Sequence, residues 1–502
     1  MGTPLKTRLS CAGCLHDAQP LEREPYPFRC ARAEPGDDID HVMRRSLHVA
    51  AWREAPAADA GPSAATPGAA NPLVQYRRRL YSYHVARAHG LADTDFVDLV
   101  SDLDCRVASY EGHGCRATPF GSADRLGEAL DLPPGTLWLK DETSNVGGSH
   151  KIRHLSGVLV YLRVVETLLE RGLLPEEAPG IAHIVAEPAA PLAIASCGNA
   201  ALAASILARA AGRQLEAYVP PSAELPVLEQ LAARGARIVT CPRRVGERGD
   251  PCYLRFREAL SGGAVPFCCQ GPDNGLAIEG GQTIAYEMLD ALGGDPLDRL
   301  FVQVGGGAFA SACVRGFEEA VAAGTIARLP RIHAVQTDGA WPLVRAYDRV
   351  AARLLARADP DGGWTMPALA AHERSEAARA IRQFATPADI HDAMRDAVTH
   401  RASFMWPWDT EPRSLAHAIL DDETYDWAAV VEGMLLSGGW PVVVDDEQLA
   451  RTNALAQEGT GQPVCVSGSA GLAGLFTLQQ AAPTGAVMPG ERVAVVFSGR
   501  QR

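Results

Sequence analysis

From Leu137 onward, short apolar runs of the chain alternate with longer segments whose apolar residues recur every three or four positions. The short runs, such as "LWLKDE", "LAIAS" and "RLFVQV", predict strands, and the longer segments, such as residues 151–171 and 199–212, predict helices. Regular alternation of strands and helices is typical of a mainly parallel sheet. The pattern therefore predicts an α/β fold.

Two parts of the chain do not follow this alternation. The stretch "EAPAADAGPSAATPGAA", Glu54 to Ala70, is alanine, proline and glycine without an apolar period, as in a linker. The first fifty residues hold three cysteines among charged and proline residues, and we expect them to form an appendage. Residues from about 361 to 445 are richer in tryptophan, histidine and charge, and we interpret them as an insertion.

Composition and charge narrow the class of protein. The 502 residues are 47% hydrophobic, which is enough for two or more units with buried cores. The formal net charge of -13 argues against nucleic acid as the main partner, because a phosphate backbone is bound by a basic face. We find no run typical of a signal peptide or a membrane span, so we expect a cytoplasmic protein with no membrane partner. Twelve cysteines in that compartment are expected to be buried thiols or metal ligands.

A glycine-rich turn follows one of the predicted strands. In "VQVGGGAFAS" the strand runs into Gly305, Gly306 and Gly307, and a helix follows at once. Missing side chains let backbone N–H groups approach an anion, and a helix N-terminus adds a favourable dipole. A phosphate cradle is one interpretation, and a tight turn that binds nothing is another. A dinucleotide loop is disfavoured because the spacing is not G-x-G-x-x-G.

Three more short stretches combine small residues with polar groups. "ASCGNAALAAS" passes from strand to helix, which on its own is explained by an ordinary helix cap. "VSGSAGLAGL" is explained equally by close packing of backbones. "GGSHKIR" places Lys151 at the start of a predicted helix, directly after a glycine pair.

Taken in chain order, these stretches resemble the pyridoxal-phosphate enzymes of fold type II, which include the tryptophan synthase β subunit, threonine synthases and threonine dehydratases. "KDETSNVGGSHKIR" is similar to the lysine motif K-x-E-x-x-x-x-x-G-S-x-K-x-R, and "SCGNAALA" to the motif S-x-G-N. "IEGGQTIAYE" resembles the I-E-G-x-x-T stretch of threonine synthases, which usually carry Gln-Lys where this chain has Gly281 and Gln282. His150 before Lys151 is closer to the tryptophan synthase β subunit. The resemblance covers about residues 71 to 500.

The resemblance implies a cofactor and its ligands. Lys151 would hold pyridoxal phosphate as a Schiff base and then act as base on the substrate α-proton. Lys140 is the competing lysine, but it lies inside a strand and precedes a carboxylate pair, so Lys151 is favoured. The implied phosphate ligands are the backbone N–H groups of Gly305, Gly306, Gly307, Ala308 and Phe309. Asn199 would bond the ring hydroxyl, and the substrate carboxylate would be bound by Ser196, Cys197 and Gly198.

The resemblance also implies an organisation of the chain. A large cofactor-binding domain would comprise residues 71–143 and 266–502, with a small domain at 144–265. Residues 1–70 would form the appendage and linker. We expect a homodimer with a small amino-acid substrate, without nucleic acid or membrane as partner.

The late serine-glycine turn indicates the reaction. The motif match places Ser467 against the pyridine nitrogen, with Ser469 the alternative if the register slips. A hydroxyl stabilises a protonated ring less than a carboxylate, which favours loss or replacement of a β-substituent. We therefore predict β-elimination or β-replacement on a serine- or threonine-like amino acid. Threonine-synthase-like γ-replacement is the second candidate, and a non-catalytic binding module is a third of another class.

The N-terminal cysteines are a separate feature. Cys11-x-x-Cys14 followed by Cys30 resembles three of the four ligands of a zinc ribbon, which some threonine synthases carry. His41 or His16 would complete a tetrahedron, although a second C-x-x-C is missing. The alternative is unliganded thiols. A zinc ion here would be structural, because it would lie on a tethered appendage.

Overall fold

The computed structural model describes residues 6–49, 52, 71–186, 190–247, 249–358, 371–480 and 487–501. Their contacts group into two compact units. Unit 1 comprises the described residues of Met1–Pro35, His41–Ala117 and Asn145–Thr283, and unit 2 comprises those of Gly36–Asp40, Thr118–Ser144 and Ile284–Arg502. The expected linker at Glu54–Ala70 lies outside the described residues.

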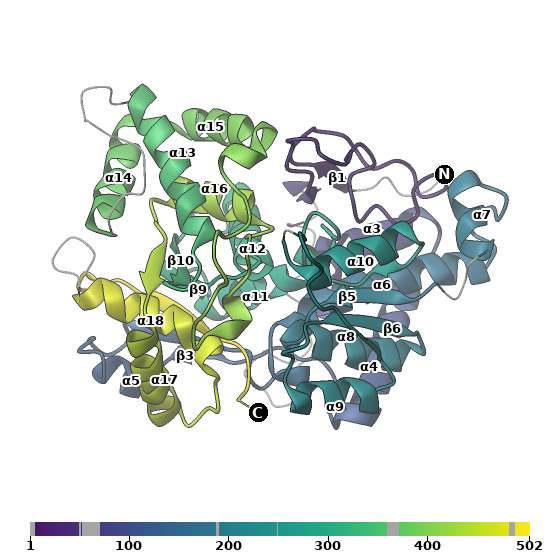
Figure 1. Ribbon diagram of the computed structural model, residues 1–502, viewed down its shortest axis with the longest axis horizontal. Coiled ribbons are helices and arrows are strands. Elements are labelled where there is room, and N and C mark those ends of the chain that lie inside the picture. Colours follow the sequence, from purple (N-terminus) through teal and green to yellow (C-terminus); the bar gives the residue numbers. More distant parts are fainter. Residues whose placement is uncertain are drawn as a thin grey trace. The chain divides into compact units, whose positions relative to one another are not determined.

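Unit 1 contains an antiparallel hairpin and a four-stranded parallel sheet (Figure 1). The hairpin is formed by β1 (Thr7–Cys11) and β2 (Met43–Leu47). The sheet has the order β7-β6-β5-β8, with β5 (Leu192–Ala195), β6 (Leu215–Val219), β7 (Arg237–Thr240) and β8 (Val265–Pro266). The helices are α2 (Pro72–Gln75), η1 (Arg77–Arg79), α3 (Tyr81–Ala88), α4 (Asp93–Glu111), η2 (Val146–Gly148), α6 (Lys151–Glu170), α7 (Pro179–Ala186), α8 (Asn199–Ala211), α9 (Leu225–Ala233) and α10 (Pro251–Ser261).

Unit 2 contains a six-stranded sheet of order β11-β10-β9-β12-β4-β3. Neighbouring strands are parallel except for β3 and β4. The strands are β3 (Phe120–Ser122), β4 (Leu137–Asp141), β9 (Arg299–Gln303), β10 (Arg331–Thr337), β11 (Val442–Val444) and β12 (Val493–Phe497). The helices are α5 (Asp124–Glu128), α12 (Ala308–Ala322), α13 (Pro342–Ala358), α14 (Ala371–Phe384), α15 (Pro387–Thr399), η3 (Arg401–Ser403), η4 (His417–Ile419), α16 (Trp427–Ser437), α17 (Asp446–Thr460) and α18 (Val466–Gln480). Helix α11 (Ala277–Leu292) begins in the residues of unit 1 and ends in those of unit 2.

The central strands of the unit 2 sheet are buried along their whole length, including the polar Arg299 and Gln303 at the two ends of β9. Every residue of β9, "RLFVQ", and of β12, "VAVVF", is buried. Both faces of a parallel sheet are covered in such folds, so its strands read as continuous apolar runs. Helix α18 packs on β9, β10, β11 and β12. Its small residues permit this approach, since a Cβ on Gly471 would lie 3.0 Å from the Phe301 carbonyl oxygen.

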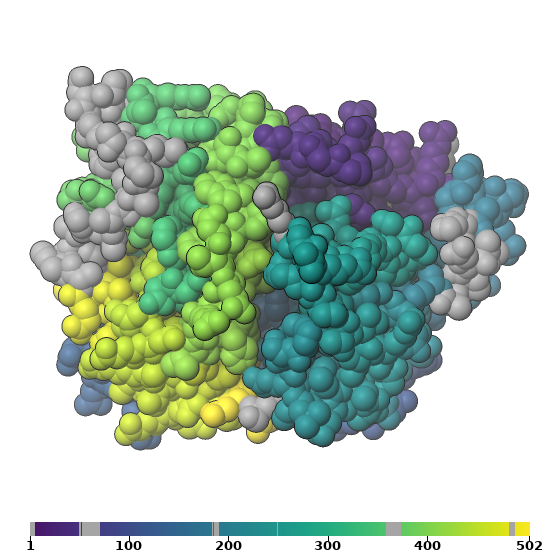
Figure 2. Space-filling model, in the orientation of Figure 1, coloured from purple at the N-terminus to yellow at the C-terminus, as the bar shows by residue number. Residues whose placement is uncertain are grey.

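The units divide the chain at points other than the expected ones. Residues 71–117 group with 145–283 instead of with the C-terminal part, and the second boundary lies at Thr283 instead of at 265. The described residues before 36 are also part of unit 1. The reason is packing that periodicity does not reveal, because α3 and α4 contact α6, and α4 contacts α8. In the space-filling view the N-terminal residues, in purple, lie against other residues of this unit (Figure 2), and the Gly180 amide donates to the Glu22 carbonyl at 3.1 Å.

The expected α/β architecture is confirmed, with strands and helices alternating along most of the chain. The segment interpreted as an insertion, about 361 to 445, contains α14, α15, α16 and β11 among its described residues. Strand β11 pairs with β10 at the edge of the sheet, so the end of this segment belongs to the unit 2 fold. Among the described residues, no helix combines the length and the apolar character that a membrane span needs.

Candidate functional site

Lys151 is the first residue of α6, and two glycines turn the chain into that helix. Gly147 and Gly148 have φ angles of 68° and 71°, a region that is costly for residues with a Cβ. Ser149 is extended and buried, and His150 is the N-cap. Burial lowers the pKa of His150 well below its ordinary value, and the charge of Lys151 lowers it further. The glycine pair therefore presents a half-buried lysine beside a neutral imidazole.

The first turns of α6 pack closely on the start of α11. A Cβ on Gly157 would lie 3.1 Å from the Gly280 Cα, and a Cβ on Gly280 would overlap the Arg153 carbonyl oxygen. Arg153 is buried and donates a hydrogen bond of 3.0 Å to Thr283 Oγ1. Gly280 of "IEGGQT" is thus needed for contact between two helix backbones, and a Cβ on Gly281 would overlap the His154 ring. This contact fixes the helix that begins with the candidate lysine.

The asparagine loop follows β5 in unit 1. Ser196, Cys197 and Gly198 lead directly into α8, whose first residue is Asn199, and all four residues are half-buried. The Gly198 amide donates to Ser196 Oγ at 3.3 Å. Helix α8 packs on both α6 and η2. The loop and Lys151 therefore belong to helices that contact each other inside one unit.

The glycine loop lies in unit 2, where β9 leads into α12. Gly307 is the N-cap of α12 and has a φ angle of 94°, in the left-handed region. Ala308 and Phe309 begin the helix. The first N–H groups of a helix have no acceptor within it, and the helix dipole favours an anion there. The local geometry fits a phosphate group held by backbone N–H groups.

Residues 419–426 pack on the same loop. A Cβ on Gly305 would overlap the Asp421 carboxylate, and one on Gly307 would lie 2.8 Å from Thr424 Cγ2. The bare backbone of the loop is therefore required by this packing as well as by any ligand. The Asp421 carboxylate brings a negative charge close to the loop, which opposes an anion. Nothing in "LDDETYD" distinguishes this stretch from a solvated acidic loop.

The serine-glycine turn forms the first turn of α18. Ser467 Oγ accepts a hydrogen bond of 3.1 Å from the Ala418 amide. Ser469 Oγ accepts one of 2.9 Å from Asn453 Nδ2. Both serines are buried. Gln303, the last residue of β9, donates at 2.9 Å to the carbonyl of the glycine between the serines, so the turn lies at the end of β9 that leads into the glycine loop.

The competing lysine has a structural role. Lys140 is fully buried in β4, where its Nζ is ion-paired with Glu287 and donates a hydrogen bond of 2.7 Å to the Thr118 carbonyl oxygen. Glu142 lies 3.9 Å from the same Nζ. Because its charge is neutralised in the core of unit 2, Lys140 is held by the fold. The geometry favours Lys151 as the reactive lysine.

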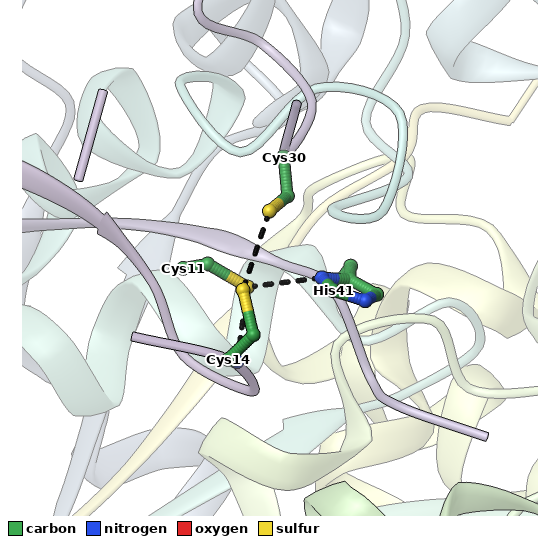
Figure 3. Close-up of side chains that lie close together, drawn as sticks. All are labelled: Cys11, Cys14, Cys30 and His41. Carbon is green, nitrogen blue, oxygen red and sulfur yellow. Dashed lines mark hydrogen bonds between the residues drawn. The ribbon is translucent and has the colours of Figure 1, made fainter. Parts of the chain in front are cut away.

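The N-terminal cysteines and one histidine converge in unit 1 (Figure 3). The ligand atoms of Cys11, Cys14, Cys30 and His41 all lie within 4.8 Å of one another. Cys11 Sγ lies 3.4 Å from His41 Nδ1, and the Cys14 and Cys30 sulfurs are 3.5 Å apart. A tetrahedral zinc with Zn–S bonds of about 2.3 Å gives ligand separations of about 3.7 Å. The cluster, which contains His41 and not His16 among the described residues, fits such an ion.

The expected site residues thus form three groups. Lys151 and the asparagine loop lie in unit 1, as does the cysteine and histidine cluster. The glycine loop and the serine-glycine turn lie in unit 2, at the carboxyl end of the central strand β9.

Comparisons with known proteins identify the family and the fold. A model of the family described as "Pyridoxal-phosphate dependent enzyme" matches residues 113–399, more than half of the chain. Threonine synthase of Methanosarcina acetivorans is 27% identical over 252 residues, which are 49% of this chain and 53% of that protein. The chain spans about half the length of the threonine synthases that it matches.

Solved structures show the same fold. Maize serine racemase has a TM-score of 0.50 and 16% identity, with 80% of this chain and 93% of that chain covered. Threonine deaminase isoform 2 from Solanum lycopersicum has a TM-score of 0.50 and 13% identity, with 82% of this chain and 86% of that chain covered. At such identities the likeness concerns the fold alone.

Proposed function

The chain belongs to the family of pyridoxal-phosphate dependent enzymes of fold type II, and on this basis we propose that it catalyses β-elimination or β-replacement on a serine- or threonine-like amino acid. The observation that carries the proposal is the half-buried Lys151 at the start of α6, after two glycines with positive φ. When bound, the cofactor supplies an electrophilic carbon and an electron sink for the substrate. The same fold occurs in threonine deaminase and in a fungal L-serine ammonia-lyase from Rhizomucor miehei, so the proposed reaction class is compatible with it.

The residues of unit 1 would handle the amino-acid part of the substrate. Lys151 Nζ would hold the cofactor covalently and, once released, accept the proton from the substrate Cα. The Ser196 hydroxyl and the following backbone N–H groups would bind the substrate carboxylate. The Asn199 amide would bond the ring hydroxyl of the cofactor. Contact between α6 and α8 supports this assignment, because it keeps the base and the carboxylate site in a fixed relation.

The residues of unit 2 would bind the cofactor phosphate. The proposed donors are the backbone N–H groups of Gly305, Gly306, Gly307, Ala308 and Phe309. These groups act together with the dipole of α12. The nearby Asp421 carboxylate contributes a repulsion that they must outweigh.

The serine-glycine turn supports β-chemistry. A hydroxyl facing the pyridine nitrogen makes the ring a weaker electron sink than a carboxylate does, so a departing β-substituent is favoured. Ser469 Oγ bonds Asn453, and Ser467 Oγ accepts one backbone N–H while its own proton can be donated. We therefore propose Ser467 as the partner of the pyridine nitrogen.

Threonine-synthase-like γ-replacement is the second candidate, because threonine synthases are among the sequence relatives. The two reactions differ in the position of the leaving group. Elimination from serine or threonine releases ammonia and a 2-oxo acid, whereas γ-replacement needs a homoserine derivative with a leaving group at Cγ. A binding module of this fold would bind cofactor and turn over neither substrate.

The visible absorption of the purified protein with a panel of amino acids tests the proposal. We expect a yellow protein, borohydride fixation of the cofactor on the Lys151 peptide, and a 2-oxo acid from serine or threonine. Turnover of the Cγ-activated substrate alone would favour the second candidate. Cofactor on Lys140, or none after addition of pyridoxal phosphate, contradicts the assignment.

We further propose that Cys11, Cys14, Cys30 and His41 bind one structural zinc ion. Soft thiolate and imidazole donors in a closed set of four are the usual ligands of structural zinc. Metal analysis of the wild-type chain should find about one zinc per chain, and Cys11→Ser should lose it. Cys105→Ser, which changes an exposed cysteine outside the cluster, is the control.

A further inference from the structure

The residues around the proposed zinc site also contact the lysine helix and its neighbour. We propose that the metal positions α6, so that residues 11–35 and 41–45, which we call the brace, act as a metal-organised support for Lys151. This inference rests on the proposed zinc site and on the proposed role of Lys151. It differs from the expectation that the N-terminal residues are a tethered appendage.

The first contact of the brace is with α6 itself. Tyr161 lies in the middle of α6 and is fully buried. Its hydroxyl donates a hydrogen bond of 2.8 Å to the Pro25 carbonyl oxygen. The Phe28 ring meets the Tyr161 ring edge-on, with centroids 5.8 Å apart. Pro25 and Phe28 both lie between the ligands Cys14 and Cys30, so the metal would close the loop that carries them.

The second contact is with the chain that leads into α11. The Gly275 amide donates a hydrogen bond of 2.9 Å to the Phe28 carbonyl oxygen. A Cβ on Gly275 would overlap the Met43 carbonyl oxygen, so the backbone of β2 lies directly against this glycine. Met43 pairs with Cys11 across the hairpin and follows His41 by two residues. Both backbone contacts with Gly275 therefore lie within two residues of a proposed metal ligand, Phe28 near Cys30 and Met43 near His41.

The third contact is a buried charge on α11. Arg45 of β2 donates a hydrogen bond of 2.7 Å to Gln282 Oε1, and its Nε lies 3.5 Å from Glu279 Oε2. The Arg45 and Glu279 side chains are only 4% and 2% exposed. The same carboxylate accepts the Tyr81 amide at 2.6 Å. A carboxylate at this depth requires a neutralising partner, which the hairpin supplies.

The contacts continue to the start of the lysine helix. Gly280, next to Glu279, touches the Arg153 backbone, and Thr283 accepts a hydrogen bond from the Arg153 side chain. Arg153 is two residues from Lys151. Every step from the hairpin to the lysine is thus a contact between described residues of unit 1.

The metal would link the loops of the brace, because its four ligands come from different points between residues 11 and 41. Between β1 and β2 the chain has no helix or strand, so no regular ladder of backbone hydrogen bonds orders it. Cross-linking residues 11, 14, 30 and 41 through one ion removes loop entropy from the open state, as a disulfide does. Pro25, Phe28 and Arg45 then keep their positions against α6 and α11.

Hydrogen exchange on the full-length, cofactor-loaded protein tests this role. We compare the zinc-loaded protein with the same protein after chelation, and Cys11→Ser with Cys105→Ser. Loss of metal should accelerate exchange in residues 155–168 and 277–283 by roughly tenfold or more. Exchange in α18 of unit 2 serves as the internal reference and should change much less.

Two milder variants separate positioning from folding. Arg45→Lys keeps the charge and should retain the wild-type pH profile of the cofactor's visible absorption, while Arg45→Met should shift it. Tyr161→Phe removes one hydrogen bond from α6 and should raise exchange there with zinc still bound.

The results of these experiments distinguish failure of the brace, of the zinc site and of the proposed function. Zinc bound at the four ligands, with exchange in α6 unchanged on its removal, would falsify the brace and leave the zinc site standing. No bound metal in carefully prepared protein overturns both. Faster exchange in α6 on metal removal, in a protein that takes up no pyridoxal phosphate, would support the positioning of α6 by the metal and contradict the proposed role of Lys151.

Discussion

Lys140 and Glu287 form an ion pair in the core of unit 2, with both side chains almost completely buried. Lys140 lies on β4, and Glu287 lies on the part of α11 that belongs to this unit. The Glu287 carboxylate also accepts the Thr118 amide at 3.1 Å. Lys140, one of the two lysines of the family motif, is therefore a structural cation.

Removal of the Lys140 charge should destabilise the protein without moving the cofactor. Lys140→Met leaves Glu287 buried without its partner, so we expect the free energy of unfolding to fall by about 3 to 5 kcal/mol. Denaturant titration measures the loss, and borohydride fixation should still label Lys151. The double variant with Glu287→Gln should lose less. A Lys140→Met protein of wild-type stability would show that the pair contributes little.

The glycine loop should be sensitive to a single methyl group. At Gly307 an alanine would meet Thr424 at 2.8 Å in addition to adopting a φ angle of 94°, whereas Gly461 has a similar φ angle of 70° with no neighbour within 4 Å. Gly461→Ala should cost about 1 kcal/mol from backbone strain alone. Gly307→Ala should cost more and should weaken cofactor binding, which a fluorescence or absorbance titration measures. Equal losses in the two variants would mean that the packing on the loop is loose.

Local features of the site were predictable from the sequence. The two residues before Ser149 have positive φ angles, which favour glycine. The glycine pair in the sequence therefore indicates such a turn before Lys151. The Cys11-x-x-Cys14 spacing, with Cys30 and His41, likewise predicted a cluster that the structure brings together. The chemical roles of these residues stay predictions.

Contacts between distant segments were not predictable. Asp421 meets the glycine loop across more than one hundred residues, and Arg45 bonds Gln282 across 237. Hydrophobic periodicity reports which face of an element is buried, but it does not report which polar side chain is buried with it. The boundary between the units, which lies inside α11, was not predictable for a related reason. The hydrophobic pattern of a continuous helix shows no break at such a boundary.

Acid should destabilise unit 2 through His333. This imidazole is buried between Phe301 and Trp440, and burial lowers its pKa to about 3 from an ordinary 6.5. Between these pH values the His333 side chain is protonated in the unfolded chain and neutral in the folded one. Its contribution to the free energy of unfolding is therefore complete above pH 6.5 and is lost as the pH falls toward 3. The slope attributable to His333 is at most about 1.4 kcal/mol per pH unit. His333→Phe should flatten the pH dependence of unfolding.

Substitutions in the serine-glycine turn test the reaction class, because the two serines have different hydrogen-bond partners. Ser467 and Ser469 are two residues apart, but only the Ser469 hydroxyl bonds the Asn453 amide, so the two positions differ in their surroundings. If Ser467 faces the pyridine nitrogen, Ser467→Asp should favour ring protonation and shift the products from β-elimination or replacement toward transamination. Ser467→Ala should have a milder effect.

Cofactor content must be measured first, because a buried carboxylate without a partner can destabilise the protein by itself. Ser469→Asp is the matched variant, and it should disturb stability through Asn453 while leaving the product distribution as it is in the wild-type protein. A changed product distribution in Ser469→Asp alone would show that the register is shifted by two residues. If neither aspartate changes the products or the spectrum of a cofactor-loaded protein, the turn serves the packing of α18 on the sheet, and the argument for β-chemistry loses its physical basis.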